Sequence, residues 1–313
     1  MITISPFSGK YLFFLKDLWY EFIKEEVSPE ELFFYSFKNF TLKYLEMKLW
    51  KNLFNISGFW DFFWIIEKEK KPIGMLEVFP HPLDSSKWFL RNFAIKNSFR
   101  NFGFGTETLK ILFKFILEQG GSEIFLEVRE ENPARRLYNR IGFTELDEKC
   151  FFYIPAGALF DNTGEEVEFL STYRAKDKFN QISIQWFKQM GGIALSMLEY
   201  IPSATKTGFM LSEVILFLQR QKLIIALNKD TLDKTAIVYW LKRDKKFSIE
   251  LKALLPLDKE AIIRFLKGVL GKLAGYDILF SSAGISQYKL EIAKRIGAKL
   301  YRTNIIMGKR LEE

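Results

Sequence analysis

Two stretches of the sequence repeat each other at a nearly constant distance along the chain. The segment 123–126 (Glu-Ile-Phe-Leu) corresponds to 277–280 (Asp-Ile-Leu-Phe) at an offset of 154 residues. The segment 139–142 (Asn-Arg-Ile-Gly) corresponds to 294–297 (Lys-Arg-Ile-Gly) at an offset of 155. Self-similarity at a fixed offset indicates two structurally similar halves. The alternative explanation is recurrent α/β patterning without a duplication.

Charge and aromatic residues divide the chain near the same place. Residues 1–157 carry 21 basic and 21 acidic side chains, whereas residues 158–313 carry 25 and 17, so the net charge of +8 lies entirely in the second part. Of the 33 phenylalanines, 24 precede residue 158. A length of 313 residues also suits two domains of about 100–200 residues each. We predict domains at 1–156 and 165–313, joined by a linker at 157–164 that is rich in turn-forming residues.

Composition excludes several classes of protein. A hydrophobic content of 48% with 17% aromatic residues is too high for a disordered chain. The longest uncharged apolar runs, such as 62–66, are far shorter than the ~20 residues that cross a bilayer, and the N-terminus does not resemble a signal peptide. The lone Cys150 excludes an internal disulfide, and with a single histidine, His81, it argues against a zinc site. We therefore expect a soluble, cytoplasmic protein without a metal or a membrane partner.

The hydrophobic periodicity predicts an α/β fold with a mixed sheet in the first half. Strands are predicted at 1–4, 62–67, 73–79, 88–95, 124–128 and 150–154. Helices are predicted within 10–51 and at 106–117 and 133–141. The segment Pro80-His81-Pro82 is expected to break the chain, because proline cannot donate to a strand ladder. Helices that follow single strands, beside a meander of three strands, favour a sheet of both parallel and antiparallel strands.

The loop Arg100–Thr106 lies between a predicted strand and a predicted helix. Gly103 and Gly105 allow positive φ and close approach of the backbone, so successive N–H groups can face one concavity. The helix that follows adds its N-terminal N–H groups and the positive end of its dipole, and Arg100 adds a cation. These features suit a pyrophosphate, although an ordinary glycine turn at the start of a helix has the same pattern. The loop is neither a Walker A sequence nor a Rossmann fingerprint.

A second motif follows 27 residues after Gly105: Asn-Pro-Ala-Arg-Arg-Leu-Tyr-Asn-Arg-Ile-Gly-Phe at 132–143. With the loop R-x-x-G-x-G and the strand before the motif, residues 88–153 resemble the core of the GNAT superfamily of acetyl-CoA-dependent N-acetyltransferases. The repeat then implies two GNAT-like acyl-CoA N-acyltransferase domains in tandem. The second is degenerate, because Pro256–Lys259 stands where the first half has Lys96–Gly105, and both glycines and the arginine are missing.

The resemblance implies acetyl-CoA as co-substrate and assigns a role to each matching position. In the family the fourth strand separates from the fifth and pairs with the pantetheine arm, a role that would fall on Phe93, Ala94 and Ile95. The pyrophosphate would be held by Arg100, Asn101, Phe102, Gly103, Phe104, Gly105 and Thr106. Asn132 and Arg135 are the predicted CoA contacts after the fifth strand. Tyr138 matches the tyrosine that protonates the departing CoA thiolate.

The general base has several candidates. Glu127 stands in Leu-Glu-Val-Arg, as in ribosomal-protein N-terminal acetyltransferases, and is the first choice. Glu77, on the preceding strand, and His81 are the rivals, and no dedicated base is needed if the amine arrives neutral. Cys150, on the last predicted strand of the first half, is a poor candidate for a nucleophile.

The leading hypothesis is therefore an N-acetyltransferase that transfers an acetyl group to a primary amine by direct attack in a ternary complex. The acceptor would be a small molecule, a protein N-terminus or a lysine. One alternative is a non-catalytic acyl-CoA-binding or scaffold module, and another is an aminoacyl transferase of tandem GNAT-like fold. Nucleic-acid binding requires basic residues gathered on one face, which the sequence does not show. The charge of the second half could instead steer acidic acceptors or CoA towards the site.

Overall fold

The computed structural model describes residues 1–26, 62–81, 84–158, 164, 167–171, 222–228, 237–243, 246–252, 258–282 and 288–312. The chain divides into two compact units. Unit 1 comprises Met1–Thr144 together with Met307–Glu313, and unit 2 comprises Glu145–Ile306.

Unit 1 has a mixed sheet, as the sequence predicts. Its strands are β1 (Ile2–Pro6), β2 (Phe63–Lys68), β3 (Lys71–His81), β4 (Asp84–Ile95) and β5 (Glu123–Arg129), and its helices are α1 (Leu12–Glu26), α4 (Phe104–Glu118) and α5 (Ala134–Arg140). Strands β1 to β4 are antiparallel neighbours in sequence order, and β5 joins β4 in parallel. Helix α1 packs its apolar side against this sheet, where Leu15 and Leu18 meet Phe63 and Ile65 in one buried cluster.

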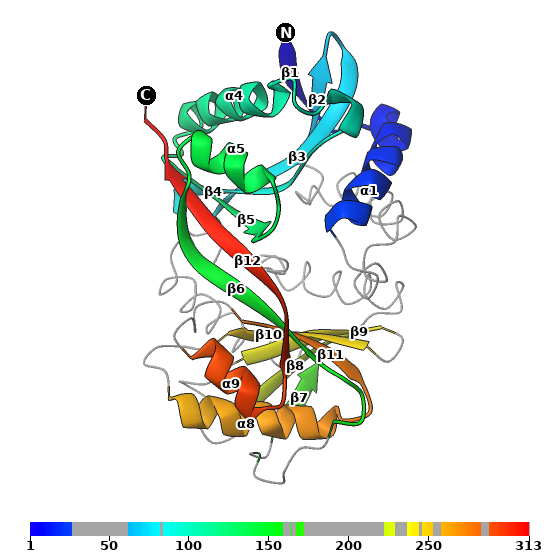
Figure 1. The fold of residues 1–313 in the computed structure, drawn as a ribbon, viewed down its shortest axis with the longest axis vertical. Coiled ribbons are helices and arrows are strands. Elements are labelled where there is room, and N and C mark those ends of the chain that lie inside the picture. Colours follow the sequence, from blue (N-terminus) through cyan, green and yellow to red (C-terminus); the bar gives the residue numbers. More distant parts are fainter. Residues whose placement is uncertain are drawn as a thin grey trace. The chain divides into compact units, whose positions relative to one another are not determined.

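Unit 2 contains both antiparallel and parallel strands, which are covered by two helices (Figure 1). Its strands are β6 (Thr144–Ile154), β7 (Val167–Ser171), β8 (Lys222–Asn228), β9 (Ile237–Arg243), β10 (Lys246–Lys252) and β11 (Asp277–Ser282), and its helices are α8 (Lys259–Lys272) and α9 (Lys289–Arg295). Strand β12 (Lys299–Arg310) begins in unit 2, and from Met307 onwards it belongs to unit 1. Strands β7 to β10 are antiparallel neighbours, and β11 joins β10 in parallel. The core of unit 2 is formed by the apolar face of α8, with Phe265 and Leu266, against β11 and β6.

In each unit, the strand that follows the last helix in sequence is called the closing strand. The two closing strands, β6 and β12, are exchanged between the units. Strand β6 follows α5 in the chain, yet it pairs with β11, from Ile154 opposite Ile278 to Cys150 opposite Ser282. The side chains of Cys150 and Ile154 accordingly lie in the core of unit 2. Strand β12 is the neighbour of β5, and just beyond it the N–H of Leu311 donates a 2.8 Å hydrogen bond to the carbonyl of Ser122. Unit 1 is therefore closed by residues that follow the whole of unit 2 in the sequence.

The elements of the two units recur at the offset of the sequence repeat. Strands β5 and β11 begin 154 residues apart, and helices α5 and α9 begin 155 residues apart. Helices α4 and α8, and strands β6 and β12, are likewise displaced by 155 residues at their first residues. The short sequence matches are thus part of a longer repeat of helix, strand, helix and strand.

Most predicted elements of the first half are present, with small differences at their ends. Strand β3 continues through Pro80, which lies opposite Trp88 of β4. Beyond Glu77 the described part of β2 no longer pairs with β3, so the missing N–H of Pro80 removes no bond on that side. Strand β6 begins at Thr144, well before residue 150, because its first half is exposed and charged and looks like a loop in sequence.

Some predictions fall on residues outside the described ranges. The helix predicted within 10–51 begins with a 3-10 turn at Gly9–Tyr11 and continues as α1 to Glu26, and its remainder lies outside the described residues. Of the predicted linker 157–164, only Gly157, Ala158 and Gly164 are described. Across the described ranges, no helix combines the length and the apolar character that a bilayer crossing requires.

Candidate active site

The parallel strands β4 and β5 are hydrogen-bonded at one end only. Their pairing runs from Lys87 opposite Glu123 to Leu90 opposite Leu126 and stops there, although β4 continues to Ile95. In unit 2 the corresponding strands β10 and β11 pair at six successive positions, from residue 246 to residue 251 of β10. Unit 1 thus has an opening between two parallel strands that unit 2 lacks.

A β-bulge lies at the start of this opening. Glu77 is opposite Arg91 and Met75 is opposite Ala94, so two residues of β4 stand against one residue of β3. Asn92, in the bulge, has a φ of +52°, a left-handed conformation that asparagine tolerates better than most residues. A bulge bends the strand that carries it and increases its twist, which accounts for the departure of β4 from β5. The one signal of the bulge in the sequence is an asparagine within an apolar strand.

Glu77 holds the bulge from the neighbouring strand. Its side chain is 1% exposed. Nε of Arg91 donates a 2.7 Å hydrogen bond to Oε2 of Glu77, and Nη2 of Arg91 donates one of 2.7 Å to Oε1. Nδ2 of Asn92 donates a third, of 2.8 Å, to Oε2. Such a bidentate, charge-assisted pair is among the strong side-chain contacts in proteins. The carboxylate of Glu77 is therefore engaged with β4.

The residues predicted to meet the pantetheine arm lie on β4 beyond the bulge. Ala94 and Ile95 are buried and Phe93 is half-buried. On the β3 side, Ala94 and Ile95 are opposite Met75 and Gly74. On the β5 side, the described residues place no strand against β4 after Leu90. The backbone of this segment is consequently available to hydrogen-bond an extended ligand.

The predicted phosphate loop connects β4 to α4. After a 3-10 turn at Asn97–Phe99, Asn101 and Gly103 adopt φ angles of +66° and +83°, and Gly103 is the N-cap of α4. Alternation of left- and right-handed backbone turns successive N–H groups towards one side, a geometry that suits an anion. Arg100 turns back and donates from Nε to the carbonyl of Ile95 at 2.8 Å.

The other loop residues fit the same use. A Cβ on Gly105 would lie 3.2 Å from Leu137 Cδ2 and 3.8 Å from both Ile95 and Phe93, so glycine lets α4 approach α5 and β4 closely. Phe102 is exposed and stacks on Phe104, with ring centroids 6.0 Å apart. Thr106 is half-buried in the first turn of α4. The loop thus combines two left-handed residues, a helix N-terminus and an arginine, as a pyrophosphate site requires.

The second motif, residues 132–143, contains the whole of α5, which neighbours α4 (Figure 1). Oδ1 of Asn132 accepts a 2.7 Å hydrogen bond from the N–H of Ala134 and so starts the helix. Arg135 donates from Nη1 to the carbonyl of Glu130. Tyr138 is 6% exposed, and its ring packs edge-on against Phe143 with centroids 5.7 Å apart.

The remaining predicted residues differ in their position. Glu127 is half-buried and is the first residue of β5 beyond the last paired residue, Leu126, so it borders the opening. His81 is buried at the end of β3, and burial lowers the pKa of its imidazole. Cys150 belongs to unit 2, and burial raises the pKa of its thiol. Within the described part of the chain, no three His, Cys, Asp or Glu side chains are grouped as metal ligands.

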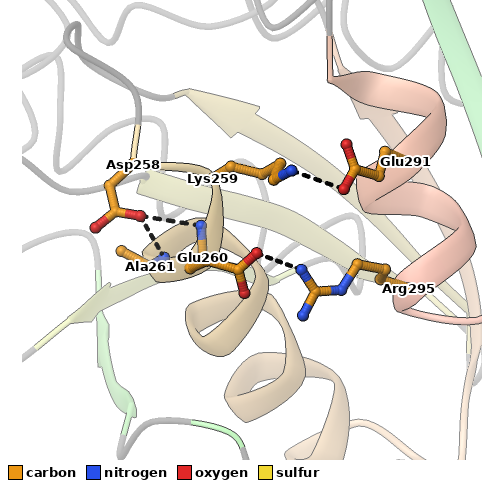
Figure 2. A network of polar contacts seen from close by, with 6 residues as sticks. All are labelled: Asp258, Lys259, Glu260, Ala261, Glu291 and Arg295. Atoms are coloured by element: carbon orange, nitrogen blue, oxygen red, sulfur yellow. Dashed lines mark hydrogen bonds and ion pairs between the residues drawn. The ribbon is translucent and has the colours of Figure 1, made fainter.

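The helix α8 of unit 2 corresponds to α4, but its N-terminus is occupied by the chain itself (Figure 2). Oδ1 of Asp258 accepts hydrogen bonds from the N–H groups of Glu260 and Ala261 at 3.0 and 3.1 Å. Lys259 pairs with Glu291 at 2.7 Å, and Glu260 pairs with Arg295. A side-chain carboxylate therefore satisfies the helix N–H groups that a phosphate would need.

The first unit matches a known family in sequence. Residues 20–143, which include the opening and the loop, match the sequence model of the acetyltransferase (GNAT) family. This segment is a GNAT acetyltransferase domain. The ribosomal protein bS18-alanine N-acetyltransferase of Haemophilus influenzae is 41% identical over 76 residues, which are 24% of this chain and 51% of that protein. The chain thus spans about half the length of this curated relative.

Solved structures share the fold over the whole chain. A protein from Pyrococcus horikoshii, described as an acetyltransferase, superposes with a TM-score of 0.60 at 13% identity and covers 99% of this chain and 90% of its own. A GCN5-related N-acetyltransferase from Sphaerobacter thermophilus superposes with a TM-score of 0.57 at 12% identity, covering 100% and 96%. The prediction of a GNAT fold is confirmed, and both neighbours extend beyond the GNAT domain of residues 20–143.

Proposed function

We propose that unit 1 is an acetyl-CoA-dependent N-acetyltransferase that transfers an acetyl group to a primary amine by direct attack in a ternary complex. The observation that carries this proposal is the end of β4–β5 pairing at Leu90 and Leu126, which leaves the rest of β4 without a described strand on that side before the loop Arg100–Thr106. A strand edge suited to an extended arm is thereby followed by a helix N-terminus suited to a phosphate. We also propose that the protein acts in the cytoplasm, where its lone cysteine stays reduced.

The side chains at the opening suit the chemistry of amide formation. Bound acetyl-CoA supplies a thioester carbonyl as the electrophile. Backbone N–H groups of β4 beyond Leu90 can donate to the carbonyl oxygen as it gains charge. The hydroxyl of Tyr138 donates a proton to the departing sulfur, and Glu127 accepts the proton that the amine loses. Glu77 acts through the bulge, as a positioning residue for β4.

The first acceptor to consider is a protein N-terminus. The Haemophilus influenzae relative is named for an alanine of a ribosomal protein, and such an acceptor presents an α-amino group, whose pKa near 8 leaves a useful neutral fraction at pH 7. A lysine amine, with a pKa near 10.4, requires stronger help from a base. The rate advantage of an N-terminal over a lysine acceptor at pH 7 is therefore part of the proposal.

Unit 2 is, in our proposal, a diverged internal copy that makes up a tandem arrangement without a second CoA site. The matching offsets of its elements support the duplication. The continuous pairing of β10 with β11 and the Asp258 cap of α8 support the loss of the site. One CoA bound per chain is the expected stoichiometry.

The test combines calorimetric titration with an assay of CoA-thiol release from acetyl-CoA over peptides, lysine derivatives and polyamines. We expect one CoA per chain and thiol release with peptides that have a small N-terminal residue. A Gly103→Glu/Gly105→Glu variant should lose CoA affinity while it keeps its circular dichroism spectrum, because two carboxylates then face the phosphate loop. Unchanged affinity in the folded variant would reject this loop as the CoA site. Tight CoA binding with no release over the whole panel would favour a binding module.

A further inference from the structure

Unit 1 contains a cavity that the proposed chemistry does not use. It has a volume of about 360 Å³, within the range typical of small-molecule sites. Helix α4, the end of α5 and strand β12 contribute to its wall. The lining residues are Thr106, Lys110, Phe113, Arg140, Ile141 and Lys309.

Three cations from three different elements meet at this cavity. Lys110 lies on α4, Arg140 in the last turn of α5, and Lys309 on β12. In the part of the chain that the structure describes, none of the three forms an ion pair with a carboxylate. Gathering like charges around one concavity is unfavourable unless an anion binds there. The cavity therefore has the charge of a site for a multiply charged anion.

Lys309 is held over the apolar part of the cavity. Its Nζ atom lies 5.9 Å from the centroid of the Phe113 ring, within the range of a cation–π contact. A Cβ on Gly142 would lie 3.0 Å from the same Nζ, so the glycine, which has a φ of +91°, leaves room for the lysine. Phe113 and Ile141 add apolar surface on which a flat ring can rest.

The cavity continues from the phosphate loop along one face of α4. Thr106, Lys110 and Phe113 are spaced by four and three residues and so share a helix face. Thr106 belongs to the loop, and Lys110 lies one turn further on, about 6 Å along the axis. This spacing suits a ligand with two phosphate groups a few bonds apart. CoA is such a ligand, because its ribose carries the pyrophosphate at the 5′ position and a phosphate monoester at the 3′ position.

The positions of unit 2 that correspond to Thr106 and Arg140 pair with each other. Within α4 and α8 the buried residues repeat at 154 residues, since Leu109, Leu112 and Ile116 match Ile263, Leu266 and Leu270. Thr106 thus corresponds to Glu260, and at 155 residues Arg140 corresponds to Arg295. Glu260 and Arg295 form an ion pair with each other (Figure 2). Unit 2 thus supplies its own carboxylate to the arginine, whereas unit 1 has a threonine there, and among the described residues no carboxylate pairs with Arg140.

We propose that this cavity binds the 3′-phosphate of CoA, and that Lys309 of the exchanged strand makes unit 1 discriminate CoA from dephospho-CoA. The inference rests on the proposed function, because it requires CoA as the ligand. It assigns a role in the site of unit 1 to a residue that lies beyond unit 2 in the sequence.

The experiment compares the affinities of CoA and 3′-dephospho-CoA by calorimetry for the full chain. Wild type should bind CoA about 10-fold more tightly or better, the usual effect of charge-assisted contacts to a phosphate. Lys309→Met, which keeps an apolar stem over Phe113, and Arg140→Met should each lower this ratio several-fold without changing the affinity for dephospho-CoA. Lys114→Met is the matched control, since Lys114 is 81% exposed on α4 outside the cavity and should leave the ratio unchanged.

The possible results separate this inference from the proposed function. Equal affinities of the wild type for CoA and dephospho-CoA would overturn the inference and leave the acetyltransferase proposal standing. An unchanged ratio in folded Lys309→Met would likewise overturn the role of Lys309. Binding of neither compound by the folded wild type would overturn both proposals. A CoA affinity that falls more steeply with salt than that for dephospho-CoA would support the extra ionic contacts.

Discussion

The amide Nδ2 of Asn92 donates a 2.8 Å hydrogen bond to Oε2 of Glu77 across two neighbouring strands. It joins a residue with left-handed backbone to a carboxylate that is almost completely buried. The same carboxylate binds Arg91, so two consecutive residues of β4 are fixed from β3 at the point where β4 leaves β5. The opening between the parallel strands is therefore held by side chains as well as by the backbone.

Replacement of Glu77 should damage both stability and activity. Glu77→Ala leaves the half-buried Arg91 without its bidentate partner and should cost about 2–4 kcal/mol of unfolding free energy, measured with urea. It should also raise KM for acetyl-CoA, because the bulge loses its anchor. The control is Glu67→Gln, since Glu67 is also buried but binds Ser5 and Tyr11, away from the bulge. That variant should lose stability and keep its KM, and equal KM changes in the two variants would contradict a positioning role for Glu77.

Removal of the hydroxyl of Tyr138 should lower the rate of acetyl transfer and leave the affinity for CoA unchanged. Tyr138→Phe retains the edge-on contact with Phe143 and so should fold normally. If the hydroxyl protonates the leaving sulfur, kcat should fall by about 10²-fold while the affinity for CoA stays the same. Steady-state kinetics with the best acceptor and calorimetry with CoA measure the two quantities. A kcat within about twofold of wild type would remove Tyr138 from the mechanism.

Stability should decrease as the pH falls below neutral, through His81. Burial lowers the pKa of His81 from 6.5, so the unfolded chain binds the proton more readily than the folded one. Above the unfolded-state pKa of 6.5, His81 is neutral in both states and its contribution to the free energy of unfolding is complete. As the pH falls below 6.5, the unfolded chain takes up the proton first, so this contribution is lost. The chain has one histidine, so His81→Gln should flatten the change in Tm between pH 7.5 and 5.5. Parallel curves for the two proteins would show that another group is responsible.

Two glycines should respond in opposite directions to the same substitution. A Cβ on Gly121 would lie 2.4 Å from Nε1 of Trp88 and 2.5 Å from Cγ2 of Ile116, so Gly121→Ala should cost about 1–3 kcal/mol through overpacking. Around the Cβ position of Gly271, in α8, the described residues outside its own helix backbone place no atom within 4 Å. Gly271→Ala should therefore stabilise unit 2 by about 0.5–1 kcal/mol, because alanine favours a helix. Thermal unfolding followed by circular dichroism distinguishes the two, and a stable Gly121→Ala would contradict the close packing of α4 on β4.

The sequence predicted the fold where local pattern determines it. Helix α4 has its apolar residues Leu109, Leu112 and Ile116 on one face, and all three are buried. The backbone of the proposed phosphate loop was predictable because Gly103 marks a left-handed position next to a helix start. The strand exchange was not predictable, because β6 and β12 occupy equivalent places in the repeat and each would fit either closing position. Only non-local pairing distinguishes them, and a local pattern does not report it.

The catalytic end of the site was less predictable than the loop. Glu77 on β3 and Glu127 on β5 are carboxylates on the two strands that flank β4, and in the sequence only the resemblance of Leu-Glu-Val-Arg to ribosomal-protein acetyltransferases ranks Glu127 first. Their surroundings differ because Arg91 and Asn92 reach Glu77, through a bulge that shifts the register by one residue. The charged cavity was also missed, since Lys309 is separated from Lys110 by the whole of unit 2.

The exchanged strand has a consequence for how the chain folds during synthesis. While residues 1–144 emerge from the ribosome, unit 1 lacks the strand that lies beside β5, and that edge of its sheet stays exposed. Strand β6, which comes next in the chain, is the one that could pair there in error. Correct assembly must wait until residue 310 has left the exit tunnel, so the GNAT domain, although synthesised first, is the last to be completed. A ribosome-associated chaperone that shields the edge of β5 during this interval would favour the native pairing.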